Sequence, residues 1–406
     1  MHKEIFKNTS AQAVSRILTT GIGFLITIMV ARYFGPYFFG EFTKITSLVT
    51  LFYLFVDFGL NAVFIKEDKD FSNLFYTRLF ISFFVFALAN IIAFLFPYNQ
   101  VSDIGFSPFV RWGIFIFSFS LFAQSITFST AAFFQKNLRW DLFMISQVIG
   151  AVFNIFITSL LIFFAKSLNL VIVSFAVSSF LTAVISLILA NQKISKFELK
   201  YCRKLFLSSI PLGLMLIFNL IYFRIDIFLL SLFKSNVDVG VYSLAYKFFD
   251  FFIAIPLFLS NSLYPKMLES LKSRGAFSKL IKNYFFVYLL LAILIIIPVW
   301  FTTPLFGLIR SNFTPAYLPF RILILSLPVF FLTSFVQWIL IAMNKQKFLV
   351  YVYLLSVIIN IFLNMLLIPK YSYIASSILT GLSEIFVLAL LVLKLKQTRI
   401  FSEKPR

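Results

Sequence analysis

The sequence predicts an all-α integral membrane protein of about 12 transmembrane helices, in two six-helix lobes with both termini in the cytoplasm. Three observations carry this prediction. Of the 406 residues, 61% are hydrophobic and only 12% are charged, about half the charged share of a soluble protein. Long apolar runs recur along the whole chain, and basic residues concentrate in alternate segments between them. This composition excludes a water-soluble enzyme and a disordered chain.

Each apolar run is long enough to cross a bilayer, since a transmembrane helix takes about 20 residues. Charged or turn-forming residues mark the ends of the runs. We place the spans at 10–32, 40–61, 74–96, 112–135, 142–165, 170–190, 208–233, 241–262, 283–305, 320–343, 348–368 and 372–394. Spans of this number and length leave no room for a large soluble domain.

The net charge of +20 arises from 35 Lys and Arg residues against 15 Asp and Glu residues. In a soluble protein such an excess would indicate a nucleic-acid partner. Here, with the N-terminus inside the cell, the cytoplasmic segments hold about three times as many basic residues as the outer ones, which is the positive-inside pattern. An odd number of spans would have blurred this asymmetry, so both termini are expected in the cytoplasm.

The longest basic stretch, NQKISKFELKYCRKLFL at 191–207, lies at the middle of the chain. Its apolar residues recur at helical spacing beside Lys and Arg, which is typical of an interfacial helix on anionic lipid. We therefore predict an N-terminal lobe at 1–195, a cytoplasmic basic linker helix at 196–207 and a C-terminal lobe at 208–406. Short polar turns that end in Gly40 and Gly240 occupy matching places in the two lobes, as in duplicated transporters.

Metal and disulfide chemistry are excluded by the residue counts. Cys202 and His2 are the only cysteine and histidine of the chain. The sequence also has no phosphate-cradling glycine loop and no nucleophile–histidine set. We therefore predict no metal, no cofactor, no direct use of ATP and no enzymatic activity. Coupling to protons or to sodium stays open.

Charged side chains inside apolar spans indicate a functional site, because each costs about 3 kcal/mol or more unless it faces a partner or a cavity. Such residues lie within or near the predicted spans: Arg16, Asp57, Arg224, Asp226, Lys247, Asp250 and Glu384. Chain direction places Arg16 and Asp57 toward the cytoplasmic side, where they are able to meet. The four charges of spans 7 and 8 form a second layer nearer the outside. The alternative is a set of structural ion pairs that fix helix packing.

Helical spacing sharpens these expectations. Arg224 and Asp226 are two residues apart and point to different sides of their helix, so they do not pair well. Lys247 and Asp250 are three residues apart and share a face, which favours a pair. Arg224 either pairs with Asp250 across the helices or stays available to an anion.

The stretch 219–269 contains the elements RID, VGVYSLAYKFFD and LYP in that order. Together with Arg16, ARYFGPYFFGEF and VDFGLN in the N-terminal half, it resembles the polysaccharide-exporting flippases of the multidrug/oligosaccharidyl-lipid/polysaccharide exporter superfamily. The likeness covers the whole chain in topology and is specific at about 10–66 and 205–270. It implies two six-helix lobes around a partly cationic cavity that opens alternately to the two sides.

The resemblance implies a flippase in the bacterial cytoplasmic membrane for undecaprenyl-diphosphate-linked oligosaccharide, such as the repeat unit of O-antigen in lipopolysaccharide, of capsule or of a similar glycan. It also implies a glycan polymerase and a chain-length regulator as partners. Under this interpretation Arg16, Arg224 and Lys247 contact the substrate, because Arg binds phosphate oxygens at two points. The acidic residues Asp57, Asp226, Asp250 and Glu384 would pair with these cations or carry a coupling ion.

Two alternatives remain. A drug/cation antiporter of the same superfamily would use carboxylates such as Asp226, Asp250 or Glu384 to bind cations, although Arg and Lys residues lie beside them. A membrane enzyme of glycan assembly would need catalytic groups in a large outer loop. The longest outer loops, near 97–111 and 306–319, contain only Asp103, Arg111 and Arg310 as charges.

Overall fold

The computed structural model describes residues 2–67, 71–194, 197–271, 273–302 and 306–397. These residues are helical almost throughout. The chain divides into two compact units, Met1–Leu220 (unit 1) and Ile221–Arg406 (unit 2), and each is described by itself. The predicted lobe boundaries at 195 and 207 stay a prediction.

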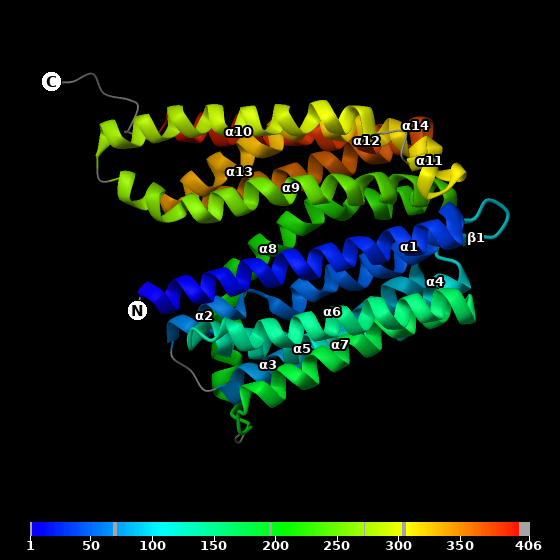
Figure 1. The fold of residues 1–406 in the computed structure, drawn as a ribbon, viewed down its shortest axis with the longest axis horizontal. Coiled ribbons are helices and arrows are strands. Elements are labelled where there is room, and N and C mark those ends of the chain that lie inside the picture. Colours follow the sequence, from blue (N-terminus) through cyan, green and yellow to red (C-terminus); the bar gives the residue numbers. More distant parts are fainter. Residues whose placement is uncertain (1, 68–70, 195–196, 272, 303–305, 398–406) are drawn as a thin grey trace. The chain divides into compact units, whose positions relative to one another are not determined.

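Unit 1 is a bundle of long helices joined by short turns (Figure 1). Its elements are α1 (His2–Asp57), α2 (Leu60–Glu67), α3 (Phe71–Leu95), β1 (Tyr98–Asn99), β2 (Ile104–Gly105), α4 (Pro108–Ser118), α5 (Ser120–Lys136), α6 (Trp140–Leu160), the π-helical turn η1 (Leu161–Ala165), α7 (Leu168–Ala190) and the first part of α8 (Leu199–Phe233). Helix α1 packs against α6, and α5 and α6 both pack against α7.

Unit 2 contains the second part of α8, followed by a further set of long helices. These are α9 (Asn236–Ser270), α10 (Arg274–Thr302), α11 (Phe306–Ile309), the 3-10 helix η3 (Ser311–Ala316), α12 (Tyr317–Leu325), α13 (Leu327–Ala342) and α14 (Gln346–Lys396). Helix α13 packs against α9, α10 and α14, so it lies at the centre of the unit.

The two longest helices are each broken once. In α1 the backbone leaves the helical region at Gly35 (φ 78°, ψ 178°), a conformation that glycine adopts far more readily than any other residue. In α14 the break is at Ser372 (φ 51°, ψ −140°). A third bend, of 42°, separates α12 from α13, where Pro328 stands in the first turn of α13.

A short antiparallel hairpin, β1–β2, closes the end of unit 1 that lies opposite the N-terminus (Figure 1). The sequence predicts a plain loop here, so the hairpin is an addition to the all-α prediction. Gly105 has a φ of 94°, and a Cβ at this position would overlap the carbonyl oxygen of Pro97. The buried Lys44 of α1 holds the hairpin by donating a hydrogen bond to the carbonyl oxygen of Gly105 (2.7 Å).

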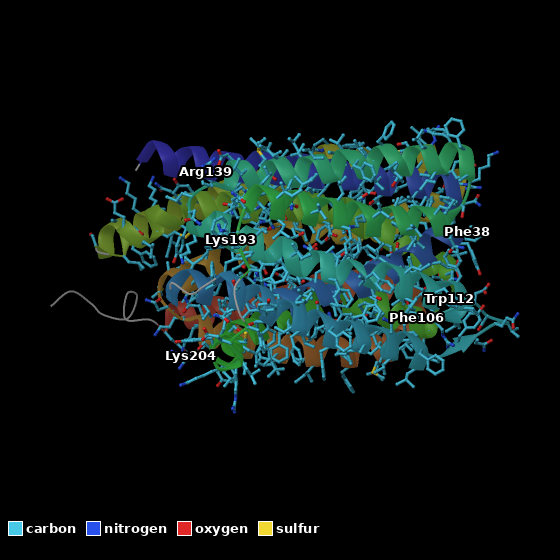
Figure 2. The ribbon with its side chains drawn as sticks, turned by 90° about the horizontal axis from the view of Figure 1, so that it is seen from below. Phe38, Phe106, Trp112, Arg139, Lys193 and Lys204 are labelled. Carbon is cyan, nitrogen blue, oxygen red and sulfur yellow. The ribbon has the colours of Figure 1, made fainter. Side chains whose placement is uncertain are left out.

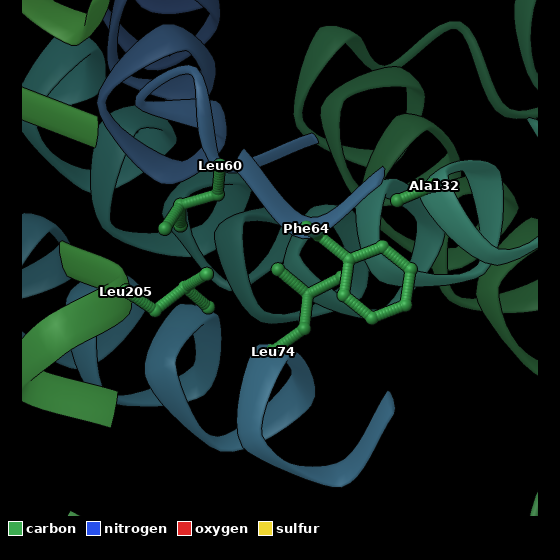
Figure 3. Close-up of a cluster of buried hydrophobic side chains, with 5 residues drawn as sticks. All are labelled: Leu60, Phe64, Leu74, Ala132 and Leu205. Atoms are coloured by element: carbon green, nitrogen blue, oxygen red, sulfur yellow. The ribbon is translucent and has the colours of Figure 1, made fainter. Parts of the chain in front are cut away.

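The opposite end of unit 1 is basic. Figure 2 shows Arg139, Lys193 and Lys204 at this end, and Phe38, Phe106 and Trp112 at the hairpin end. Next to Lys204 in the sequence, Leu205 of α8 belongs to a cluster of buried hydrophobic side chains (Figure 3). The other members come from α2, α3 and α5: Leu60, Phe64, Leu74 and Ala132. One turn from Leu205, the buried Cys202 donates a hydrogen bond to the carbonyl oxygen of Asn73 (3.5 Å).

Of the predicted linker helix at 196–207, residue 196 lies outside the described residues, and residues 199–207 form the start of α8. Helix α8 begins at Leu199 and continues unbroken to Phe233, so the basic segment is the first part of a long helix and not a separate element. Leu205, one of the apolar residues of this segment that were expected to face lipid, is buried in the cluster of Figure 3. Hydrophobic burial against α2 and α3 therefore fixes this end of the helix.

The described residues contain nine helices that are long and apolar enough to cross a membrane, or ten if α12 and α13 together form one span. Every predicted span falls on such a helix or on the bent pair, apart from residues 303–305 of the span 283–305, which lie outside the described residues. The prediction of a helical multi-pass membrane protein is therefore confirmed.

Candidate functional site

The first part of the candidate site is an ion pair between α8 and α9. Nη2 of Arg224 lies 2.8 Å from Oδ2 of Asp250. The guanidinium also stacks on the ring of Tyr246, 5.3 Å from its centroid, and the Tyr246 hydroxyl donates a hydrogen bond to the carbonyl oxygen of Phe223. The side chains of Arg224 and Asp250 remain 27% and 21% exposed, so the pair is only partly buried. Arg224 was expected either to pair with Asp250 or to stay available to an anion, and in the structure it pairs with Asp250.

Lys247 lies one turn before Asp250 on α9 and is exposed. It is within electrostatic range of both Arg224 and Asp250, but it forms no ion pair with any residue that the structure describes. The expected Lys247–Asp250 pair is therefore not formed, because Arg224 occupies the carboxylate. We call Arg224, Lys247 and Asp250 the charged triad; its formal charge is positive.

Asp226 turns away from the triad, as its spacing from Arg224 predicts. It is buried, accepts a hydrogen bond from the Tyr242 hydroxyl and accepts a second from the backbone N–H of Ile227 (2.9 Å). Tyr242 is itself fully buried on α9. Asp226 is therefore held by neutral donors inside unit 2.

Glu384 on α14 is also buried, with 2% of its surface exposed. Its Oε2 accepts a hydrogen bond from the hydroxyl of Tyr222 on α8 (2.9 Å). The Tyr222 ring packs beside Tyr353, whose hydroxyl donates to Oε1 of Gln337 (2.8 Å). Glu384 thus belongs to a polar centre of unit 2 that is rich in tyrosine.

In unit 1, Asp57 pairs with Arg78 and not with Arg16. Nη2 of Arg78 lies 3.0 Å from Oδ1 of Asp57, and it donates a second hydrogen bond to Oδ1 of Asn61 (2.6 Å). Arg78 has no exposed surface, whereas Asp57 is 19% exposed. Arg16 is exposed on the first segment of α1. The structure therefore replaces the expected Arg16–Asp57 contact with a clamp across the break between α1 and α2.

Sequence reasoning missed three charges of unit 1. Arg78 was not among the candidates, although it lies four residues inside the predicted span 74–96. Glu41 and Lys44, at the start of the predicted span 40–61, were not singled out, but both are buried, and Glu41 accepts a hydrogen bond from Ser107 (2.6 Å). Their spacing of three residues, just inside an apolar span, was the available signal.

The described residues contain no group of His, Cys, Asp and Glu that would hold a metal ion. The charged triad instead offers one partly exposed guanidinium and one exposed ammonium group. These groups bind oxyanions, Arg by two parallel hydrogen bonds and Lys as a point charge. The arrangement suits binding and release of an anionic ligand.

Charged side chains held inside apolar helices are typical of helical membrane proteins that bind or move a polar ligand. A family model described as polysaccharide biosynthesis protein matches residues 5–271, and a second, MatE, matches residues 211–366. The first covers well over half of the chain. The protein therefore belongs to the polysaccharide biosynthesis family, the polysaccharide flippases of the multidrug/oligosaccharidyl-lipid/polysaccharide exporter superfamily.

Solved structures share this fold. The chain matches the lipid II flippase MurJ in an inward closed conformation, with a TM-score of 0.80, 16% identity, and coverage of 97% of this chain and 88% of that one. It matches an inward-facing multidrug resistance MATE transporter with a TM-score of 0.73, 11% identity, and coverage of 94% and 96%. It matches the eukaryotic MATE transporter AtDTX14 with a TM-score of 0.66, 15% identity, and coverage of 98% of this chain and 97% of that one. No curated protein sequence matches the chain.

Proposed function

We propose that the protein moves undecaprenyl-diphosphate-linked oligosaccharide from the cytoplasmic to the outer leaflet of the bacterial inner membrane by alternating access. The observation that carries this proposal is the charged triad of unit 2. It leaves cationic groups partly exposed on apolar helices, where lipid alone would not stabilise them. A diphosphate supplies the oxygens that these groups bind.

The barrier to unaided flipping supports the class of activity. Each hydroxyl of a sugar that loses its hydrogen bonds in hydrocarbon costs about 4 kcal/mol or more, and an oligosaccharide has many hydroxyls. A polar path through the protein removes most of this cost, while the lipid tail stays in the bilayer. Polymerisation of the product on the outer side would then make a glycan polymerase and a chain-length regulator the partners.

We further propose twelve spans with both termini in the cytoplasm. Helices α1 and α14 are 56 and 51 residues long, and each is broken once. A single span takes about 20 residues, so each of these helices is long enough to cross twice. With the bent pair α12–α13 as one span, this arrangement agrees with the predicted ranges and the positive-inside pattern.

Inverted membrane vesicles from a strain that lacks the gene provide the test. Labelled lipid-linked repeat units should reach the luminal face only when the protein is restored. Arg224→Ala should lower this transfer at least about tenfold, as expected for loss of one charged hydrogen-bond partner. The transfer by Arg224→Lys should lie between that of the wild type and that of Arg224→Ala. Arg139→Ala, which removes an exposed arginine at the basic end of unit 1, is the matched control. Equal transfer with and without the protein would refute the proposal.

Drug/cation antiport is the second candidate, and the MatE match over residues 211–366 favours it. The buried carboxylates Asp226 and Glu384 would then bind the cation. Drug-susceptibility profiling separates the two functions. A multidrug shift on deletion, with normal surface glycan, would replace the flippase proposal.

A further inference from the structure

Tyr246 of α9 contacts α8 in two different ways, and neither contact has a role in the function proposed above. The guanidinium of Arg224 lies over its ring, with Cζ 5.3 Å from the ring centroid. Its hydroxyl donates a hydrogen bond to the carbonyl oxygen of Phe223, the residue before Arg224 (3.1 Å). One side chain therefore holds both the charged group of Arg224 and the backbone from which that group projects.

The hydrogen bond to Phe223 supports the α8 backbone at a point where it is disturbed. In an α-helix the carbonyl of Phe223 accepts from the backbone N–H of Ile227. Here that N–H donates to Oδ1 of Asp226 (2.9 Å), and such side-chain acceptors compete with the helix for the donor. The Tyr246 hydroxyl gives the carbonyl a further donor at the position where α8 presents Arg224.

The Tyr246 ring is itself held in place. It has 2% of its surface exposed and packs beside the rings of Tyr242 and Phe249, with centroids 5.6 and 5.9 Å away. Phe249 in turn packs edge-on against Phe330 of α13 (5.1 Å). The guanidinium thus meets an aromatic face of fixed position, to which a cation is attracted.

Tyr246 and Asp250 hold different parts of the guanidinium. The two residues are four positions apart on α9 and share a face of the helix. Tyr246 covers the flat side, and Asp250 accepts from Nη2. A single contact through Nη2 would let the planar group turn about it, and the ring removes this freedom. Within the described part of the chain Arg224 makes no other hydrogen bond, so Nε and Nη1 keep their hydrogens for a ligand.

We propose that Tyr246 is the positioning residue of the charged triad. It holds the guanidinium of Arg224 in the orientation in which Nε and Nη1 bind the phosphate oxygens of the substrate. This inference rests on the proposed function. Tyr246 acts through Arg224, so loss of the ring should weaken ligand binding only while Arg224 is present.

Nuclear magnetic resonance of the full-length purified protein with isotope-labelled arginine tests the positioning without any ligand. The signal that is missing in Arg224→Ala identifies the Nε–H of Arg224. In the wild type the ring current of Tyr246 should move this signal upfield. Tyr246→Leu should return it to the ordinary arginine position, whereas Tyr246→Phe, which keeps the ring, should leave it upfield.

Tyr288→Leu is the matched control, because Tyr288 is an equally buried tyrosine on α10 whose hydroxyl is paired with Ser260 (2.8 Å). A signal that stays in place in Tyr246→Leu, or that moves as far in Tyr288→Leu, overturns the proposal. If Tyr246→Leu does not fold, the wild type decides. Without a cross-peak between the Nε–H of Arg224 and a tyrosine ring, the stacking is refuted.

Binding of inorganic diphosphate, measured by calorimetry on the purified protein, then tests the effect on a ligand. Tyr246→Leu should raise the dissociation constant about fivefold, as expected for loss of one cation–π contact. Tyr246→Phe should stay within about twofold of the wild type. Combined with Arg224→Ala, Tyr246→Leu should have no further effect, because it acts through the missing group. Additive losses in the double variant overturn the inference.

The outcomes separate this inference from the proposed function. If Arg224→Ala binds diphosphate as well as the wild type does, the inference is overturned whether or not the protein transports. If the wild type binds diphosphate through Arg224 but moves no labelled lipid-linked oligosaccharide in vesicles, the transport proposal fails. The positioning of Arg224 by Tyr246 then still stands.

Discussion

The intramembrane carboxylates have two kinds of partner. Asp57 and Asp250 face the guanidinium groups of Arg78 and Arg224, whereas Asp226 and Glu384 face the hydroxyls of Tyr242 and Tyr222. A charged partner holds a carboxylate in its ionised form, because separation of the pair in a low dielectric is costly. A hydroxyl partner does not impose the charge. The two kinds of contact therefore separate residues that maintain the fold from residues that are able to change state.

Arg78→Met should lower the free energy of unfolding by about 3 kcal/mol, because it leaves the carboxylate of Asp57 without its cation at the break between α1 and α2. Arg139→Gln is the matched control, since its ion pair with Asp141 is exposed and should contribute less than about 1 kcal/mol. Unfolding of the purified proteins in detergent measures both. Equal losses of unfolding free energy in the two variants would show that the buried pair stabilises the protein no more than the exposed pair does.

A charge swap distinguishes the structural from the ligand-binding role of Arg224. In Arg224→Asp combined with Asp250→Arg the ion pair is retained, so we expect the amount of protein in the membrane to recover relative to Arg224→Asp alone. Transfer of labelled lipid-linked oligosaccharide should stay at least about tenfold below that of the wild type, because the guanidinium now projects from the other helix. Recovery of both quantities would assign the pair to helix packing only.

At the scale of elements, the long helices bend where single residues permit it. Gly35 breaks α1, Ser372 breaks α14 and Pro328 begins α13 after a 42° bend. Helix α8, in contrast, continues without a break from the buried Cys202 to the charged residues Arg224 and Asp226. The breaks therefore mark the positions at which the chain leaves the helical path, whereas α8 is helical from Leu199 to Phe233.

Gly35→Ala should destabilise the protein by about 2 kcal/mol, because the backbone conformation at this position is nearly restricted to glycine. Gly21→Ala on the same helix is the control. No atom lies within 4 Å of a Cβ at Gly21, and replacement of a helical glycine should be neutral or should add up to about 1 kcal/mol of stability. Thermal unfolding of the two purified variants compares them. A loss of stability in Gly21→Ala as large as that in Gly35→Ala would refute the argument.

At the scale of the whole molecule, the two compact units meet in sequence inside α8, between Leu220 and Ile221. The polysaccharide biosynthesis match, residues 5–271, continues across this point. The chain is therefore not divided between two families. Its most suitable break for separate expression is the short non-helical segment before α8.

Coexpressed fragments test this division. A cut between Lys193 and Ile194, both exposed and outside any helix, should give two fragments that together restore surface glycan. A cut between Leu220 and Ile221 should not, because it interrupts the backbone hydrogen bonds of α8 inside an apolar span. Surface glycan in a deletion strain is the readout. Equal recovery with both cuts would show that an intact α8 is not required.

The sequence predicts the spans well because hydropathy is a local property of each apolar run. It also singles out the charges of spans 7 and 8, and the Arg224–Asp250 pair was one of two options. It does not identify the partner of Asp57, since Arg78 lies 21 positions away on another helix and three-dimensional packing decides the contact. The tyrosine partners of Asp226 and Glu384 were missed because they too come from other helices. The continuity of α8 was missed because its basic first part and its apolar remainder differ in local composition.

The burial of Cys202 has a practical consequence for studies of movement. This residue carries the sole thiol of the chain, and its sulfur is enclosed against Asn73. Maleimides added to the intact protein should therefore leave it unmodified, because alkylation needs an accessible thiolate. Cysteines introduced at exposed positions such as Ser102 or Lys193 would then be the reactive ones. Labelling and spin probes are thus applicable to the native chain without first removing a cysteine.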